Sequence, residues 1–369
     1  MYKVKIASKN EFYESKDTWN KLASQMQLPS IFCTWEWIYT WWEHFGKDYK
    51  LLILFVYNDS EIKGILPLAS QRRIVKNGGL IGNILCYCGS RETYSDHVDI
   101  ICPQKEAELC LEAIFAFLLS EYKEWDVLNL SHISDGNPLV TWFQNEDLPY
   151  DFEMRQVSIA PFIHVSCSFD EYVKRLGSDR RYKLKRNKKR LLEQHNIRYM
   201  PHAPTSNSEG LKYLFDLHEQ RAKSKDIEST FIGAHIFDFH NSLMQRLSKN
   251  GWVWLRFLGN EEKIVAVFYG FSFGKILSYY QMGFDPEWEY YSPGALILMN
   301  VFEEAFYNGM EECDLLRGSE KYKTIWTTNH RNLFTVNIYN KTFDGYLSKL
   351  ISYSRELIKT NYKNLFIRA

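Results

Sequence analysis

The chain has 369 residues, of which 45% are hydrophobic and 24% are charged, with 45 basic and 45 acidic side chains. This length and balance predict a globular protein of two domains. A formal net charge of zero argues against a chain that binds DNA or an anionic membrane over its whole surface. No apolar run approaches the ~18 residues that span a bilayer, and no signal peptide is visible, so we expect a cytoplasmic location.

The cysteines and histidines argue against a metal centre. Seven cysteines occur, an odd number, and none forms a Cys-x-x-Cys pair. This pattern predicts reduced thiols rather than a disulfide framework or a zinc site. The ten histidines form no metal-ligand spacing such as His-Glu-x-x-His. We therefore expect no metal.

The first half of the chain alternates strand-like and helix-like segments. The stretch 71–97 resembles an insertion, with Gly-rich pieces at 77–79 and 88–90. Period-2 and helical spacing of apolar residues predict, in chain order, strands at Leu51–Tyr57, Ile62–Ser70 and Val98–Cys102, a helix at Ala107–Leu119 and a strand at Asp126–Leu130.

The second half repeats this order. The same patterns predict a hairpin of Trp252–Leu258 and Lys263–Phe273, a strand at Ile276–Phe284, a helix over about Ser292–Tyr307 and a strand at Cys313–Leu316. Because two strands, a third strand, a helix and a further strand occur twice, the sequence predicts a duplicated domain. We expect a mixed α/β (α+β) fold in which each domain has a twisted sheet flanked by helices.

Helix-start signals divide the chain. Ser168 and Glu171 form a capping box just after the region 150–165, and a second helix start follows at Ser178. After Thr342 the apolar spacing, which includes Leu357 and Ile358, predicts a terminal helix. The expected domains are therefore 1–160 and 161–342, followed by a C-terminal helix over 343–369.

The segment that follows the strand Ile276–Phe284 is a candidate anion site. Ser292 is suited to the N-cap, and Pro293 to the first helical position. The amides of Gly294, Ala295 and Leu296 would then point out of a helix N-terminus, which can hold a pyrophosphate. The alternative is an ordinary capped helix without a ligand.

Several motifs resemble a known family. They are Gly283-Phe284-Asp285-Pro286, Tyr291-Ser292-Pro293-Gly294, the run from Asp314 to Lys323, and Trp326. Tyr94-Ser95-Asp96-His97-Val98-Asp99 and the opening run 30–46 extend the likeness over most of the chain. Together they resemble the acetyltransferase-like branch of the GNAT superfamily that is linked to cellulose and exopolysaccharide biosynthesis and is related to the Fem-type peptidyltransferases.

The resemblance implies two tandem GNAT-like domains, a degenerate first one and a second with an acyl-donor site. The usual Gln/Arg-x-x-Gly-x-Gly/Ala phosphate loop of the superfamily is absent, which leaves acetyl-CoA, a longer acyl-CoA or an aminoacyl-tRNA as donor. The expected activity is N-acyl transfer to a small-molecule or glycan acceptor such as an amino sugar. An aminoacyl-tRNA-dependent peptidyltransferase and a non-catalytic interaction protein are the alternatives.

Residues after the strand Cys313–Leu316 supply the candidate chemistry. Asp314 and Glu320 could act as base, and Tyr322 could protonate the leaving thiolate. The alternative is a structural ion-pair cluster of Asp314, Arg317 and Glu320. Arg317 joins Ser292, Gly294, Ala295 and Leu296 as a cofactor-binding candidate, and the substrate-binding candidates are Lys323, Trp326, His218, Arg221 and Asp285.

Two further patterns have competing interpretations. The basic run 180–190 predicts either a solvated helix or a surface for CoA phosphate, a lipid-linked sugar diphosphate or tRNA. Trp35, Trp37, Trp41 and Trp42 share one predicted helix, which favours core packing over a sugar-stacking platform.

Overall fold

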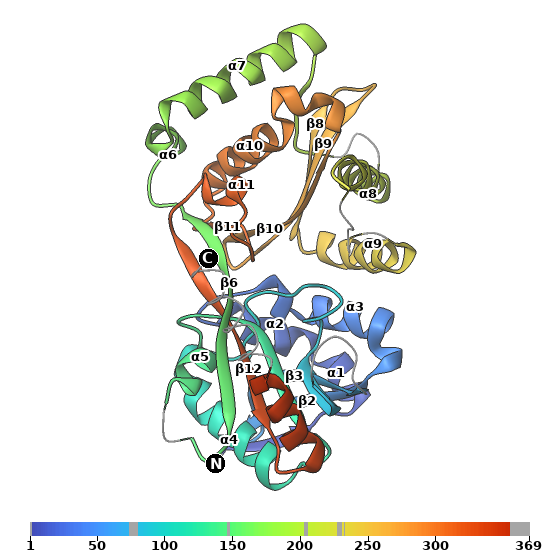
Figure 1. Ribbon diagram of the computed structural model, residues 1–369, viewed down its shortest axis with the longest axis vertical. Coiled ribbons are helices and arrows are strands. Elements are labelled where there is room, and N and C mark those ends of the chain that lie inside the picture. The colour runs from blue at the N-terminus through green and yellow to red at the C-terminus, as the bar shows by residue number, and fades with distance from the viewer. Residues whose placement is uncertain are drawn as a thin grey trace. The chain divides into compact units, whose positions relative to one another are not determined.

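The computed structural model describes residues 2–73, 80–145, 148–202, 206–226, 231 and 233–354 (Figure 1). One unit comprises Met1–Ser158 and Asn332–Ala369, and the other comprises Ile159–Arg331. The chain passes between these units inside strand β6 (Phe152–His164) and again inside strand β12 (His330–Tyr339). Residues 332–342, which the sequence analysis assigns to the second domain, are therefore counted with the first unit here.

The first unit is built on a mixed sheet with the strand order β1-β2-β3-β4-β5-β12. β4 and β5 run parallel, and the other neighbouring strands run antiparallel. The strands are β1 (Tyr2–Ile6), β2 (Lys50–Asn58), β3 (Glu61–Arg73), β4 (Gly82–Tyr87) and β5 (Val127–Ser134). The helices are α1 (Lys9–Glu14), α2 (Lys16–Ser24), α3 (Trp35–Phe45), α4 (Ala107–Ser120) and α5 (Pro138–Phe143), with 3-10 turns η1 (Ile31–Cys33), η2 (Gly46–Asp48) and η3 (Gln104–Glu106).

The third strand of the first repeat is not the one that the sequence predicts. The predicted strand Val98–Cys102 forms only an isolated bridge between Ile101 and Ile65. The carboxylate of Asp99 accepts the Ile100 amide at 2.8 Å, so part of this backbone bonds locally instead of to a neighbouring strand. Strand β4 takes its place, inside the stretch that resembles an insertion. The expected glycine piece at 77–79 lies outside the described residues.

The second unit is also built on a mixed sheet, with the strand order β6-β11-β10-β9-β8-β7. Only β10 and β11 run parallel among its paired strands. The strands are β7 (Arg198–Met200), β8 (Val253–Gly259), β9 (Ile264–Phe273), β10 (Ile276–Phe284) and β11 (Glu312–Asp314). The helices are α6 (Phe169–Arg175), α7 (Ser178–His195), α8 (Asn207–Ser224), α9 (Ala234–Ser248), α10 (Pro293–Tyr307) and α11 (Lys321–Thr324), with the 3-10 turn η4 (Pro286–Tyr291).

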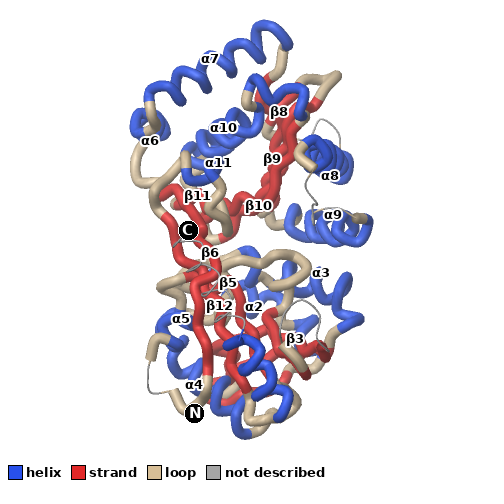
Figure 2. The backbone as a smooth tube through the Cα atoms, in the orientation of Figure 1, coloured by secondary structure: helices blue, strands red, loops and turns tan. Residues whose placement is uncertain are grey.

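Helices cover both faces of the second sheet. α6, α7 and α10 lie on one face, and α8 and α9 lie on the other (Figures 1 and 2). All ten residues of β9 are buried, as expected for a strand between two helical layers. The core under α10 joins Tyr172, Leu184 and Leu296 from three helices to the sheet. This packing holds the N-terminus of α10 at the end of β10.

Local helix signals are confirmed. Ser168 and Glu171 form the predicted capping box at α6, and α7 begins at Ser178. The chain is helical over 343–354, while Leu357 and Ile358 of the predicted terminal helix lie outside the described residues. In α3, Trp37 and Trp41 are 0% exposed and Trp35 is 9% exposed, which confirms core packing for this aromatic helix.

In the part of the chain that the structure describes, no helix is both long enough and apolar enough to cross a membrane. All seven cysteines are free thiols, and six of them are buried.

Candidate functional site

Strands β10 and β11 run together only briefly. Residues Ile276–Ser278 pair with Glu312–Asp314, but β10 continues to Phe284. After β11 the chain turns away, with Leu316 in the left-handed region at φ 54°. The Leu315 amide then donates to the Pro161 carbonyl of β6 at 2.8 Å. Among the described residues, the second half of β10 therefore has no hydrogen-bonded neighbouring strand on the side where β11 lies.

A β-bulge lies where the two strands separate. The register between β10 and β9 shifts between Tyr279 and Gln281. Bulges re-aim side chains and are common next to functional sites. From this point β10 leads directly to η4 and to the start of α10, so the helix N-terminus lies beside the unpaired part of the sheet.

The N-terminus of α10 differs from its predicted form. Ser292 occupies the N-cap position but has a left-handed backbone (φ 56°, ψ 51°), and its side chain makes no capping hydrogen bond. Its carbonyl instead accepts the amides of both Ala295 and Leu296 at 3.1 Å. The expectation of three open amides is therefore wrong for these two. The Gly294 amide has no hydrogen-bond partner within the described ranges, and Pro293 has no N–H, so the N-terminus offers one donor and its positive dipole end.

A cavity of about 210 Å³, which we call the α10 pocket, lies at this helix start. It brings together six residues that the sequence analysis selected and adds several that it did not. The selected residues in its wall are Ser292, Gly294, Ala295, Arg221, Tyr322 and Trp326, and the added ones include Lys225, Met282, Phe284, Glu289 and Leu298.

Two cations and one acid line the α10 pocket, whose wall is otherwise largely apolar. The Arg221 guanidinium lies 4.6 Å from the centre of the Phe284 ring, and no described carboxylate pairs with it. Lys225 is 3.7 Å from Glu289, so one acid offsets one of the two cations. An uncommitted guanidinium next to the N-terminus of a helix is suited to bind a phosphate or diphosphate.

Tyr322 supplies a protonated hydroxyl to the α10 pocket. Burial and the nearby Glu320 charge raise the pKa of Tyr322, while a hydrogen bond with Tyr279 and the charge of Arg221 act in the opposite direction. The two tyrosine rings meet edge to face, with their centres 6.4 Å apart. Because the pKa lies above its ordinary value, the hydroxyl of Tyr322 stays protonated at neutral pH and can donate a proton or a hydrogen bond.

His218 lies behind β10 rather than in the pocket wall. Burial, and then the charge of Arg221, lower the pKa of His218 to about 4, so its imidazole is neutral at pH 7. Its ring packs against Phe231 with the ring centres 5.4 Å apart. A Cβ on Gly283 would lie 2.9 Å from the His218 backbone nitrogen, so α8 packs directly on β10 at this glycine.

Three of the selected acids occupy different surroundings. Asp314 is 2% exposed and accepts the Leu316 amide at 2.8 Å, which holds the turn after β11. Asp285 caps η4 and pairs with Lys263 at 2.9 Å. Neither residue lines the α10 pocket. Glu320 is exposed at the start of α11, and its charge acts on Tyr322.

The remaining selected residues stabilise the segment that carries Tyr322. Lys323 is 6% exposed, and its ammonium donates to the Arg317 carbonyl and lies 3.6 Å from Glu320. Leu296 is 1% exposed in the core. Lys323, Arg317 and Leu296 thus lie outside the pocket wall, whereas the Trp326 indole forms part of it.

The added pocket residues carried a partial signal in the sequence. Lys225 follows Arg221 by four residues, the spacing that places two side chains on one face of a helix. Met282 and Phe284 alternate along β10 and therefore share one face of that strand. Residue spacing does not predict that the end of α8 and the end of β10 meet at the start of α10.

Comparisons with known proteins agree with this architecture. Residues 178–324 match the family model of the acetyltransferase (GNAT) domain. A crystal structure of FemX has a TM-score of 0.65 at 9% identity, covering 95% of this chain and 99% of that chain. A conserved protein of unknown function from Bacteroides thetaiotaomicron VPI-5482 has a TM-score of 0.56 at 10% identity, covering 92% of this chain and 100% of that chain. No curated protein sequence matches the chain.

The second unit is therefore similar to a GNAT domain over residues 178–324, and the expected mixed α/β fold with helix-flanked sheets is confirmed. The two solved structures are similar to this chain in fold. At 9% and 10% identity, the similarity indicates a shared fold alone.

Proposed function

We propose that the second unit is an acyltransferase that uses an acyl-CoA thioester and passes the acyl group to an amine. The observation that supports this proposal is the convergence of three features in the α10 pocket: a helix N-terminus, the uncommitted guanidinium of Arg221 and the protonated hydroxyl of Tyr322. The first two suit a diphosphate, and the third suits a leaving thiolate.

The size of the α10 pocket indicates which part of the donor it would hold. Its volume of about 210 Å³ is below the ~300–1,000 Å³ of sites for drug-sized ligands. It suits the diphosphate of the carrier and not the whole carrier. Gly294 and Ala295 add no long side chain of their own at the helix start, but Gly294 is buried and the Met282 side chain packs beside it, so a phosphate would approach on the side of the half-buried Ala295.

Transfer would proceed by direct attack of the amine on the thioester carbonyl. The amine must lose a proton and the departing sulfur must gain one. Glu320 is the better placed of the two selected acids to accept the amine proton, directly or through a water, because it is exposed beside Tyr322 while Asp314 is buried in its turn. Tyr322 would protonate the sulfur.

The acceptor is proposed from the family resemblance. The acetyltransferase-like branch linked to cellulose and exopolysaccharide biosynthesis suggests an amino sugar, free or within a glycan, as the source of the amine. An acetyl group is the simplest acyl group for such a reaction. Both proposals are tested with a panel of acyl-CoA donors and amino-sugar acceptors, with release of free thiol as the measurement.

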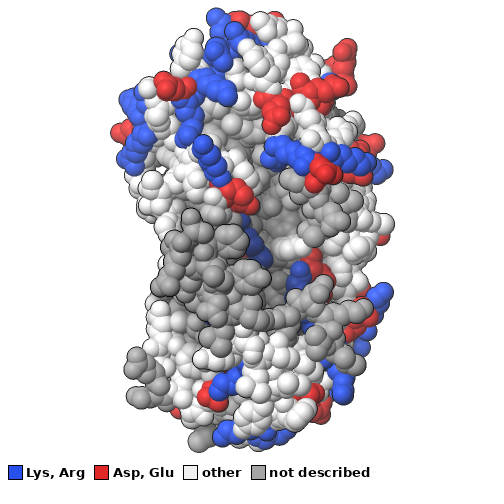
Figure 3. Space-filling view, viewed as in Figure 1, with Lys and Arg blue, Asp and Glu red and all other residues white. Residues whose placement is uncertain are grey.

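A Fem-type transferase that uses aminoacyl-tRNA is the second candidate, with comparable support. The likeness to FemX extends over 95% of the chain. Lys and Arg side chains also gather over α7 in the space-filling view (Figure 3). On α7, Lys183 and Lys185 are exposed and form no ion pair among the described residues, so they could contact RNA phosphates.

Calorimetric titration with CoA and with bulk tRNA separates the candidates. We expect CoA to bind with an affinity that falls when Arg221 is replaced by Ala. Binding of tRNA alone, with a steep salt dependence that Lys183→Ala/Lys185→Ala removes, would favour the Fem-type function. Binding of neither ligand, and no shift of the melting temperature, would favour a non-catalytic interaction protein.

A further inference from the structure

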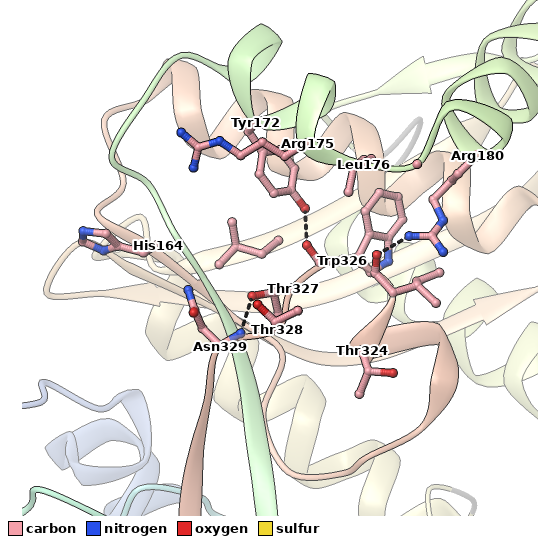
Figure 4. A pocket seen from close by; sticks show the side chains of 13 residues that line it. His164, Tyr172, Arg175, Leu176, Arg180, Thr324, Trp326, Thr327, Thr328 and Asn329 are labelled. Carbon is pink, nitrogen blue, oxygen red and sulfur yellow. Dashed lines mark hydrogen bonds between the residues drawn. The ribbon is translucent and has the colours of Figure 1, made fainter.

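A second cavity of about 330 Å³ lies in the same unit as the α10 pocket (Figure 4). The end of β6, the helices α6 and α7 and the segment 324–329 form its wall. Ile325 and Trp326 line both cavities, so the two adjoin at this dipeptide. We call the second cavity the Trp326 pocket.

The Trp326 pocket has a partly apolar wall, and the polar part of that wall carries cations and neutral groups without a carboxylate. Arg175 and His164 lie on one side of the cavity and Arg180 on the other (Figure 4). Arg175 is exposed at the end of α6 and forms no salt bridge among the described residues. Thr324, Thr328 and Asn329 complete the polar wall. This composition favours an anionic ligand with several acceptor oxygens.

The backbone that forms the floor of the Trp326 pocket is held by hydrogen bonds. The Tyr172 hydroxyl donates to the Trp326 carbonyl at 2.9 Å, and the Arg180 guanidinium donates to the Ile325 carbonyl. The Thr327 hydroxyl donates to the Phe162 carbonyl at 2.7 Å and accepts the Asn329 amide at 3.0 Å. A cavity held in this way needs little reorganisation to receive a ligand.

Arg180 and Trp326, which both line the Trp326 pocket, carry N–H donors that are not fully used. A guanidinium has five N–H donors, and one from Arg180 is bonded to Ile325. The indole Nε1 of Trp326 is buried and has no hydrogen-bond partner within the described residues. Buried polar atoms without a partner are rare in proteins and call for an explanation such as a ligand.

We propose that the Trp326 pocket binds a phosphate group of the acceptor, so that the acceptor of this transferase is a phosphate ester or diphosphate. This inference rests on the proposed function, because a transfer reaction requires donor and acceptor in adjoining sites and Trp326 lies where the two pockets meet. Donors that approach from opposite sides suit a tetrahedral phosphate better than a flat carboxylate, which a single guanidinium fork can satisfy.

Calorimetry with inorganic pyrophosphate tests this proposal. In an Ala295→Glu background, which places a negative charge in the α10 pocket, we expect one pyrophosphate site to remain. Arg175→Ala should weaken that site about tenfold, the effect of one lost charge-assisted hydrogen bond. Lys174→Ala is the matched control, because Lys174 is the exposed neighbour in α6 and does not line the cavity, and it should change the affinity less than twofold.

A second measurement reports on the indole. With ¹⁵N-labelled tryptophan, the Nε1–H signal that disappears in Trp326→Phe should shift on addition of pyrophosphate, and Arg175→Ala should require a higher concentration for the same shift. No remaining site in the Ala295→Glu background, or a site that Arg175→Ala leaves unchanged, would overturn the proposal. So would a site that prefers citrate to pyrophosphate.

Failure of this inference is distinguishable from failure of the proposed function. If CoA binds the wild type and Ala295→Glu abolishes that binding, the donor site in the α10 pocket is supported, whether or not the Trp326 pocket binds pyrophosphate. If pyrophosphate binds through Arg175 while CoA does not bind at all, the anion site stands and the acyl-CoA function falls, and with it the assignment of the ligand as an acceptor.

Discussion

The guanidinium of Arg221 lies 4.6 Å from the centre of the Phe284 ring, which joins the end of α8 to the end of β10 in front of α10. Because this cation faces the helix start and pairs with no described carboxylate, it is the side chain on which anion binding in the α10 pocket depends most. Arg221→Ala should lower CoA affinity about tenfold or more. Arg221→Lys should recover only part of the affinity, because an ammonium lacks the fork and stacks poorly.

The same substitution has a readout that needs no ligand. The charge of Arg221 helps to lower the pKa of His218, after the larger effect of burial. In Arg221→Ala the His218 pKa, followed by NMR, should rise from about 4 towards its ordinary value without reaching it. An unchanged His218 pKa would mean that the two side chains do not lie as close in solution as the structure has them.

Ala295→Glu tests charge at the helix start separately from size. A carboxylate in the first turn stabilises a helix by about 0.3–1 kcal/mol, so the melting temperature should stay unchanged or rise. The same carboxylate should repel a diphosphate and lower CoA affinity at least tenfold. Ala295→Gln has nearly the same size without the charge and should lower affinity less. Equal losses in the two variants would point to steric blocking. Gly294 is less suitable for this test, because a Cβ there would lie 2.9 Å from the Met282 side chain.

Tyr322→Phe and Glu320→Gln should lower kcat more than they change KM if these groups transfer protons. Because Glu320 lies 3.6 Å from the buried Lys323 ammonium, Glu320→Gln is expected to lower stability, and the melting temperature of each variant is measured beside its kinetics. Since the pKa of Tyr322 is raised above its ordinary 10.0, the wild-type rate should not fall with pH from 7 to 10 through loss of this proton. A basic limb in that range that Tyr322→Phe abolishes would contradict the raised pKa.

His240 predicts how stability depends on pH. Burial lowers the pKa of this 1% exposed histidine from 6.5 to about 3 in the folded state. Between those values the unfolded chain binds a proton that the folded chain does not, so the contribution of His240 is present above about pH 6.5 and is lost as the pH falls towards 3. The expected slope is up to about 1.4 kcal/mol per pH unit.

Urea denaturation at pH 7, 6 and 5 measures this contribution. His240→Phe is expected to be destabilised most at pH 7, because it lacks the Tyr269 contact, and to lose less stability than the wild type on acidification. Parallel stability curves for the two proteins would show that His240 is protonated in the folded state.

Gly283→Ala tests the close packing of α8 on β10. The added Cβ would lie 2.9 Å from the His218 nitrogen and from the Leu214 carbonyl oxygen, both backbone atoms that cannot move independently of the helix. We expect a loss of about 1–3 kcal/mol in the free energy of unfolding. Gly177→Ala, where a Cβ would meet nothing within 4 Å, is the control and should cost less than Gly283→Ala, because it only replaces the glycine N-cap of α7 by a poorer one.

Much of the second unit was predictable because its signals are local. The capping box of Ser168 and Glu171, the helix that begins at Pro293 and the strand Ile276–Phe284 each follow from a few neighbouring residues. The first unit was less predictable. Strand β4 has a weak sequence signal because its six residues lie next to a glycine-rich stretch. The apolar run Val98–Cys102 predicts a strand, but burial alone accounts for that run, which forms only one isolated bridge.

The candidate site likewise combines residues that local patterns predict with contacts that they do not predict. The residues around Ser292 are predictable because a helix start is a local pattern. Tyr322 follows from its place after the strand Cys313–Leu316, and Arg221 and Trp326 follow from the family resemblance. The amides of Ala295 and Leu296 were wrongly expected to be open, because the left-handed conformation of Ser292, which turns its carbonyl towards them, has no sequence signal. Asp285 and Lys323 lie in motifs that carry the family resemblance, but their ion-pair partners are contacts that spacing does not reveal.

Local signals in the sequence predicted the hairpin of β8 and β9, the strands β10 and β11, and the helix α10 that begins at Pro293, because hydrophobic period and capping chemistry act over a few residues. Only the tertiary structure decided that the end of α8 reaches that helix start, that Trp326 separates two cavities, and that Asp314 holds a turn instead of facing either of them. Those outcomes depend on how helices pack across a sheet, where the contacting residues are far apart in the chain.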